Sequence, residues 1–187
     1  MTLLYPVLER LKNAIKTTIL RFSDNSVAVH PRAAYKIEEG KGFSASRRFE
    51  GVAADAYVDF LFSNPPGSGK TAHIIVVDVV SLAQAHVDIY RDVSVTAPGT
   101  AVTPVNLNLG SAGESSMDVE YGGTYSLPPE PSLNTVCPGG SHIRAVGGAT
   151  EVGEKAVVPE GHNILVRVTN ASASATDISV KVTWWEE

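Results

Sequence analysis

Cysteine is the scarcest functional residue of this 187-residue sequence, which has only Cys137. One thiol cannot form an intramolecular disulfide, so stability has to come from buried apolar surface or from association between copies. Apolar runs of membrane-spanning length are also missing, and we expect no membrane partner. Charged residues from Glu9 to Lys16 interrupt the first twenty positions, and no small-residue cleavage site follows. We therefore expect no secretory signal, and a protein that is made and retained inside the cell or released by a route that needs no signal.

The residue sets that carry out catalysis or bind metals are missing as well. Cys137 has no nearby His–Asp arrangement with the signature of a nucleophile, which predicts an unreactive thiol. The histidines show no metal-ligand spacing. We expect no catalytic residue, no cofactor and no metal site, and thus a protein that is not an enzyme. The histidines are His30, His73, His86, His142 and His162.

One stretch, Phe60–Asp78, resembles a nucleotide-binding loop. Gly69, Lys70 and Thr71 match the end of the phosphate-loop pattern, but Asn64 occupies the position of its first glycine. A phosphate loop also needs a helix that begins at its Lys-Thr, whereas the residues that follow are β-branched. We therefore predict a β-hairpin, with a bend after Asn64 and Lys70 on the surface, whose two strands form the central pair of the core.

What the chain has in abundance indicates a β protein. It is 43% hydrophobic, with 16 glycines and 11 prolines, and Val, Thr and Ser dominate its second half. Strands with a period of two recur about every ten residues from Arg47 onwards, which predicts a mainly β fold: an antiparallel, jelly-roll-like β-sandwich over residues 43–187. In the last strand the alternation places Trp184 in the core and Trp185 on the surface or at a subunit contact.

The N-terminal region has a different pattern. Residues 1–22 have apolar side chains at spacings of three and four, typical of an amphipathic helix, and residues 23–42 indicate a linker with a short strand at 27–29. Such a helix has to bury its apolar stripe, either on its own domain or on another copy, and the sequence leaves both options open. The possible assembly contacts are Leu4, Leu8, Leu11, Ile15, Ile19 and Trp185.

Charge is divided unevenly between the two regions. Residues 1–50 hold nine Lys/Arg and five Asp/Glu, a net charge of +4, and residues 51–187 have a net charge of −9. The basic arm can pack on its own acidic body or dock on an acidic partner. No nucleic-acid motif and no interleaving of aromatic and basic residues is present, which argues against DNA or RNA as the partner.

A family resemblance is carried by three stretches of strand and turn. These are Val87–Tyr90, Val95–Thr100 and Thr103–Ser111, and the strands after Pro159 and Ile178 continue the likeness. Together they resemble β-sandwich virion structural proteins of tailed phages, of the head-decoration or fibre-associated type. The resemblance covers about residues 43–187. It implies a non-enzymatic, symmetric, capsid-associated role and supplies no functional residues.

The sequence thus predicts a virion structural protein that is assembled in the host cytoplasm. We expect it to bind the major capsid protein or another virion protein as a homo-oligomer, a trimer, and so to decorate or stabilise the particle. The alternative is a carbohydrate- or receptor-binding module of the same fold, with Trp185 or Tyr125 as the aromatic contact.

Overall fold

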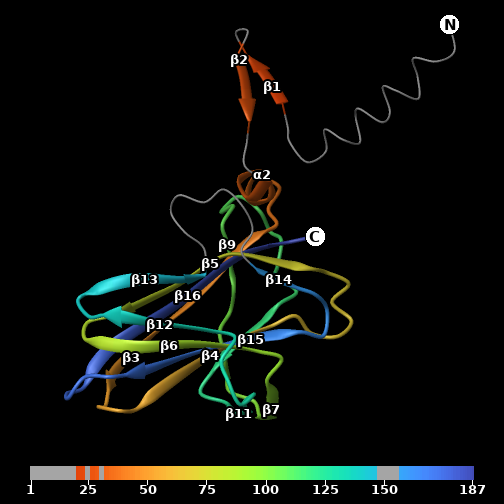
Figure 1. Cartoon of the computed structure of the whole chain (residues 1–187). Coiled ribbons are helices and arrows are strands. Elements are labelled where there is room, and N and C mark those ends of the chain that lie inside the picture. Colours follow the sequence, from red (N-terminus) through yellow and green to blue (C-terminus); the bar gives the residue numbers. More distant parts are fainter. Residues whose placement is uncertain (1–19, 24–25, 30–31, 147–155) are drawn as a thin grey trace, which may run out of the picture.

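The computed structural model describes residues 20–23, 26–29, 32–146 and 156–187. It is mainly β, with antiparallel sheets packed face to face as a sandwich, which confirms the predicted fold class (Figure 1). The elements are β1 (Leu20–Ser23), β2 (Ser26–Val29), α2 (Arg32–Glu38), β3 (Gly42–Val52), β4 (Tyr57–Ser63), β5 (Ala72–Ser81), β6 (Gln84–Arg91), β7 (Ser94–Ala97), β8 (Thr100–Ala101), β9 (Val105–Asn106), β10 (Asp118–Tyr121), β11 (Thr124–Ser126), β12 (Leu133–Pro138), β13 (Ser141–Val146), β14 (Ala156–Val158), β15 (Asn163–Asn170) and β16 (Thr176–Glu186).

Eight of these strands have the order of a jelly roll. One sheet contains the run β3–β16–β5–β13, and the other contains β4–β15–β6–β12. The chain changes sheet at nearly every connection, as it does in a jelly roll. Three short strands extend the sheets, with β9 beside β3 and β10–β8 beside β4, while β14 also pairs with β5. The insertion between β6 and β12 additionally forms the small β7–β11 sheet.

The core forms because the inward residues of the two sheets alternate with polar ones. In β16, Ile178, Val180, Val182 and Trp184 are fully buried, as the alternation predicts. Phe62 meets Trp184 edge to face, with ring centroids 4.9 Å apart. A second, smaller apolar cluster lies on the outer face of the sheet that contains β4 and β15. Leu61, Val93 and Leu165 are buried there, and the partly buried Tyr90, Tyr125 and Leu127 pack against them.

The predicted hairpin at Phe60–Asp78 is wrong. β4 and β5 are strands, as expected, but β4 pairs with β15 and β10 while β5 pairs with β16, β13 and β14. The intervening loop therefore joins one sheet to the other. Local sequence predicts strand, bend and strand, but it does not say whether the bend returns the chain to the same sheet.

The N-terminal predictions are corrected in part. Of the predicted helix over 1–22, residues 1–19 lie outside the described residues, whereas Leu20–Phe22 belong to β1, which pairs with β2. The predicted linker contains β2 and also helix α2, which the sequence did not indicate. α2 ends in a Schellman cap, because Gly40 has a φ of 74° and the amides of Gly40 and Lys41 donate to the carbonyls of Ile37 and Lys36.

Candidate binding groove at the open edge of the sandwich

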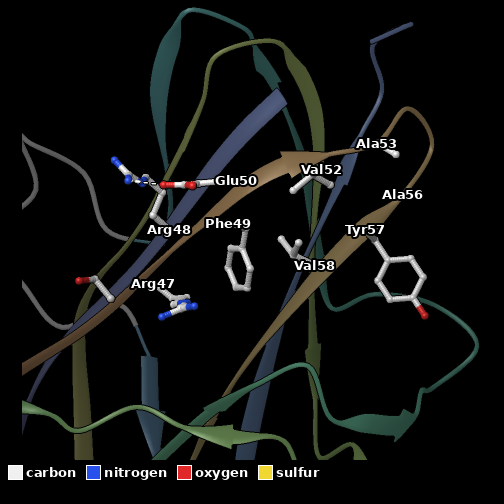
Figure 2. Close-up of a pocket in the computed structure, with 10 residues that line it drawn as sticks. Arg47, Arg48, Phe49, Glu50, Val52, Ala53, Ala56, Tyr57 and Val58 are labelled. Atoms are coloured by element: carbon white, nitrogen blue, oxygen red, sulfur yellow. Dashed lines mark hydrogen bonds and ion pairs between the residues drawn. The ribbon is translucent and has the colours of Figure 1, made fainter. Parts of the chain in front are cut away.

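One side of the sandwich is open where β3 and β4 lack strand neighbours. β9 pairs with β3 only at Phe43 and Ser44, and β10 pairs with β4 only from Phe60 onwards. Among the described residues, no strand pairs with that side of β3 from Ser46 to Val52. Between the two strands lies a shallow groove of about 750 Å³, which we call the edge groove (Figure 2). Its lining residues are Ser46, Arg47, Arg48, Phe49, Glu50, Val52, Ala53, Ala56, Tyr57 and Val58.

The link from β3 to β4 holds the groove open by fixing where the two strands separate. Asn170 of β15 is fully buried, and its side-chain amide donates to the carbonyls of Val52, Ala53 and Ser174. The main chain of Asn170 is also bonded to Asp55 and Ala56. A buried amide with its hydrogen bonds satisfied anchors this corner, because breaking the set would leave polar groups unpaired in the interior.

The floor of the groove is aromatic. Phe49 meets Tyr121 edge to face, with centroids 5.7 Å apart, and the Arg47 guanidinium lies 4.5 Å from the centre of the same Tyr121 ring. Arg47 belongs to the inward-facing set of β3, with Ala45 and Phe49, yet it is exposed because the sandwich is open there. No carboxylate pairs with Arg47 within the described part of the chain. The Arg48 side chain, by contrast, is paired with Glu50.

Every second residue of β3 directs its main-chain N–H and C=O groups towards the groove. Lys41 accepts a hydrogen bond from Glu186, on the β16 side, and Gly42 accepts one from Leu107, on the β9 side. Because this direction alternates along an antiparallel strand, the N–H and C=O groups of Ser46 and Arg48 point away from β16. The groove therefore combines an aromatic floor with a strand edge and a guanidinium that have no pairing partner in the described part of the chain.

The outer rim is formed by Tyr57, whose side chain points out of the groove in Figure 2 and is 55% exposed. Arg167 of β15 lies 3.9 Å from the centre of its ring and makes a bidentate pair with Asp59, at 2.8 and 2.7 Å. The hydrogen bond that Arg167 donates to Asp59 is the main reason why the pKa of Arg167 is raised. Since Asp59 is only 5% exposed, this pair fixes the position of Tyr57 at the rim.

Trp185 is not on the surface, and this prediction is wrong. It is fully buried beneath α2 and stacked on His73 at 3.8 Å with an interplanar angle of 1°. Arg32 and Lys36 of α2 lie 4.7 and 5.6 Å from its ring centre. The sequence did not indicate α2, and so it could not show that Trp185 is covered. The other predicted contacts, Leu4, Leu8, Leu11, Ile15 and Ile19, lie outside the described residues.

Glu187 links this aromatic stack to α2. Its carboxylate accepts from Arg32 at 2.7 Å and contacts His73 at 2.9 Å. Burial acts to raise the pKa of Glu187, but the hydrogen bond and charge of Arg32, with His73, outweigh it and lower the pKa. The end of the sandwich under α2 is therefore closed by aromatic and ionic contacts.

The loop that resembles a phosphate loop binds a carboxylate of its own chain. The amides of Gly67 and Gly69 donate to the two oxygens of Glu160, at 2.7 and 3.0 Å. Asn64 is buried, and its side chain bonds to the carbonyls of Lys70 and Val158. Strand β5 begins at Ala72, where a phosphate loop would need a helix, and Lys70 is exposed as predicted.

The described part of the chain offers little other chemistry. No three His, Cys, Asp or Glu residues of that part come together as a possible metal site. Cys137 is fully buried. Among the described helices, none is both long and apolar enough to cross a membrane. The sequence signal that could have indicated the edge groove is the pair Arg47-Arg48 within an otherwise strand-like pattern.

Comparison with known proteins does not assign a family. No family model matches the chain, and no curated protein matches it. Among solved structures, one match is the Yersinia pseudotuberculosis-derived mitogen, with 12% sequence identity over 75% of this chain and 82% of that chain. Its TM-score is 0.26, which is too low to carry an argument about fold or function.

Proposed function

We propose that the protein is a non-enzymatic virion structural protein that binds a capsid or tail surface as a homo-oligomer, a trimer. The sequence resemblance to β-sandwich virion proteins of tailed phages supports the setting. The fold is compatible with it, because jelly rolls serve as viral capsid domains. Jelly rolls are also found in lectins, so the fold by itself does not decide between the two functions.

The observation that carries the proposal is the edge groove. Protein partners commonly add an extended segment to a free sheet edge, where main-chain hydrogen bonds give affinity and side-chain pockets give specificity. Ser46 and Arg48 supply the main-chain groups, and Phe49 supplies the apolar contact. Arg47 is available for a carboxylate of the partner, and the carboxylate would replace water around a guanidinium that has no ion pair with the described residues.

The alternative function, glycan binding, has less support from the described residues. Trp185 is buried and cannot form a sugar platform. Tyr125 is partly buried, and its hydroxyl donates to Glu120 at 3.1 Å. Burial, together with the charge of Glu120, raises the pKa of Tyr125. A glycan-array signal that is lost in Tyr125→Ala would nevertheless favour this alternative over the virion proposal.

The test is co-sedimentation of the full chain with virus particles purified from a culture that produces the protein, combined with light scattering of the free protein. We expect particle-bound protein in copy numbers divisible by three and a free mass three times the 19.8 kDa of one chain. Protein that is absent from purified particles, or that is monomeric at every concentration, would overturn the proposal.

A variant series tests the groove itself. The double variant Arg47→Ala/Phe49→Ala should weaken binding to particles at least tenfold, because it removes the cation and the apolar floor of the groove together. Lys70→Ala is the matched control, since it also removes an exposed cation, and it should bind as the wild type does. If Lys70→Ala instead abolished a measurable affinity for ATP, the nucleotide-binding interpretation rejected from the sequence would stand.

A further inference from the structure

Residues 105–109, which are strand β9 followed by a bend and the start of a turn, have their polar and apolar sides reversed. Val105, Leu107 and Leu109 are 58%, 36% and 90% exposed, while the two residues between them are partly buried. On an ordinary sheet surface the apolar side chains of an alternating segment face the core and the polar ones face water. We call Val105, Leu107 and Leu109 the outward stripe.

Two asparagines hold the stripe in this orientation. Asn106 donates to the carbonyls of Gly40 and Gly113, at 2.8 and 3.0 Å, and Asn108 donates to the carbonyl of Glu38 at 2.9 Å. Their side-chain oxygens in turn accept from the main-chain amides of Asn108 and Gly110. These bonds fasten the segment to the end of α2, so the exposure of the three apolar side chains is built into the fold.

The cap of α2 packs closely against the turn that follows the stripe. Gly40 carries a positive φ, and a Cβ at this position would collide with the Ser111 side chain. β9 also pairs with β3 beside the buried Phe43. The outward stripe is thus a rigid apolar surface at the α2 end of the sandwich, where β9 and α2 lie together in Figure 1.

The segment that precedes β1 begins close to this surface. Leu20 pairs with Val29, so the chain enters and leaves the β1–β2 hairpin at the same end, and α2 begins three residues later at Arg32. Three residues span at most about 10 Å, and the seven residues of α2 add roughly 10 Å. The apolar periodicity of residues 2–19 therefore starts on the order of 20 Å from the outward stripe.

The outward stripe is shorter than segment 2–19. Val105 to Leu109 spans at most four extended steps, about 13 Å, and only Val105 and Asn106 are strand residues. A helix from Leu4 to Ile19 would span fifteen helical steps, about 22 Å, which leaves part of the apolar side of the segment for contact with another copy. Charge is complementary as well. Segment 2–19 carries Arg10, Lys12 and Lys16 with only one acidic residue, while the exposed Glu114 follows Gly113, whose carbonyl accepts from Asn106 within the stripe segment.

We propose that the outward stripe of one copy receives the apolar side chains of residues 2–19 from a neighbouring copy, so that exchanged N-terminal segments hold the oligomer together. The inference rests on the proposed homo-oligomer and adds to it the contact that forms it. The edge groove then remains available for the virion surface, because it lies elsewhere on the sandwich.

A cysteine pair tests the contact in the full chain. Ile15→Cys with Leu109→Cys should form disulfides between chains on mild oxidation, giving dimers and larger species on a non-reducing gel. Ile15→Cys with Leu82→Cys is the matched control, because Leu82 is 67% exposed but lies in the β5–β6 turn, and it should remain a monomer band. Equal crosslinking in both pairs, or a disulfide within one chain, would overturn the proposal.

A second pair of variants does not depend on cysteine chemistry. Leu107→Ser with Leu109→Ser should raise the dissociation constant of the oligomer at least tenfold, while Leu82→Ser should leave it unchanged. Circular dichroism checks that each variant is folded. An oligomer that persists unchanged in the double variant overturns the role of the outward stripe and leaves the proposed function standing. A wild-type protein that is always monomeric overturns both.

Discussion

Strand β3 passes through two opposite environments within eleven residues. At Phe43 and Ser44 it lies between β16 and β9, under α2 and next to the two tryptophans. From Ser46 to Val52 it is an edge strand that lines the edge groove. The same strand is thus structural at one end and available for binding at the other. Exposed edges are normally protected by charges and bulges, and here Arg47 and the irregular pairing near Gly51 have that effect as well.

The difference between the two ends of β3 predicts that substitutions at the closed end, under α2, cause the largest loss of stability. Trp184→Ala should lower the free energy of unfolding by about 3–5 kcal/mol, because it empties a fully buried site between Phe43 and Phe62 and removes the bond from its Nε1 to Glu186. Denaturant unfolding measures this change. A loss below about 1 kcal/mol would mean that the sheets pack differently at this end.

Trp185→Ala should come next, with a loss of about 3 kcal/mol. Its ring is stacked between His73 and the cations of α2, but its Nε1 has no hydrogen-bond partner among the described residues, so no bond is lost there. The variant should also speed tryptic cleavage at Arg32 and Lys36 of α2. Unchanged cleavage would show that α2 is held by other contacts.

At the open end, Phe49→Ala should cost only about 1–2 kcal/mol, because Phe49 is half-buried and contributes mainly its edge contact with Tyr121. Thermal unfolding is the measurement, and Ser46→Ala is the control at an exposed position of the same edge. A loss as large as that of Trp184→Ala would remove the distinction between the two ends of β3.

The smallest expected effect is on stability at acid pH, through Glu39 at the C-terminal cap of α2. A hydrogen bond from Tyr35, with further help from Lys41 and Lys36 against an opposing effect of burial, lowers the pKa of Glu39 to about 2. A lowered folded-state pKa stabilises the protein above about pH 4.5, and this contribution disappears as the pH falls towards 2. Glu39→Gln should therefore cost less than about 1 kcal/mol at neutral pH, because Glu39 is exposed.

Unfolding midpoints of wild type and Glu39→Gln, measured between pH 7 and pH 2, check this pH dependence. The two curves should converge at the acid end. A difference that stays constant down to pH 2 would contradict the lowered pKa.

Sequence patterns predicted the strands that form the core but not how they pair. The alternation in β16 identified Ile178, Val180, Val182 and Trp184 as inward, and the β-branched run after Thr71 excluded the helix of a phosphate loop. The hairpin of β4 and β5 was wrong, because a bend has the same residues whether it stays in one sheet or crosses to the other. The pair Arg47-Arg48 was the sequence signal for the groove, but the exposure of Arg47 could not be predicted, since an inward position is exposed only if the sandwich is open beside it.

Periodicity and turn residues by themselves determined a mainly β sandwich with an inward Trp184, because side-chain direction along a strand follows from the backbone alone. The tertiary structure decided what covers each surface. It buried Trp185 beneath α2, left β3 without a neighbouring strand among the described residues at the edge groove, and turned Val105, Leu107 and Leu109 outward through the hydrogen bonds of two asparagines to the end of α2. Those outcomes depend on contacts between residues far apart in the chain, which no local pattern specifies.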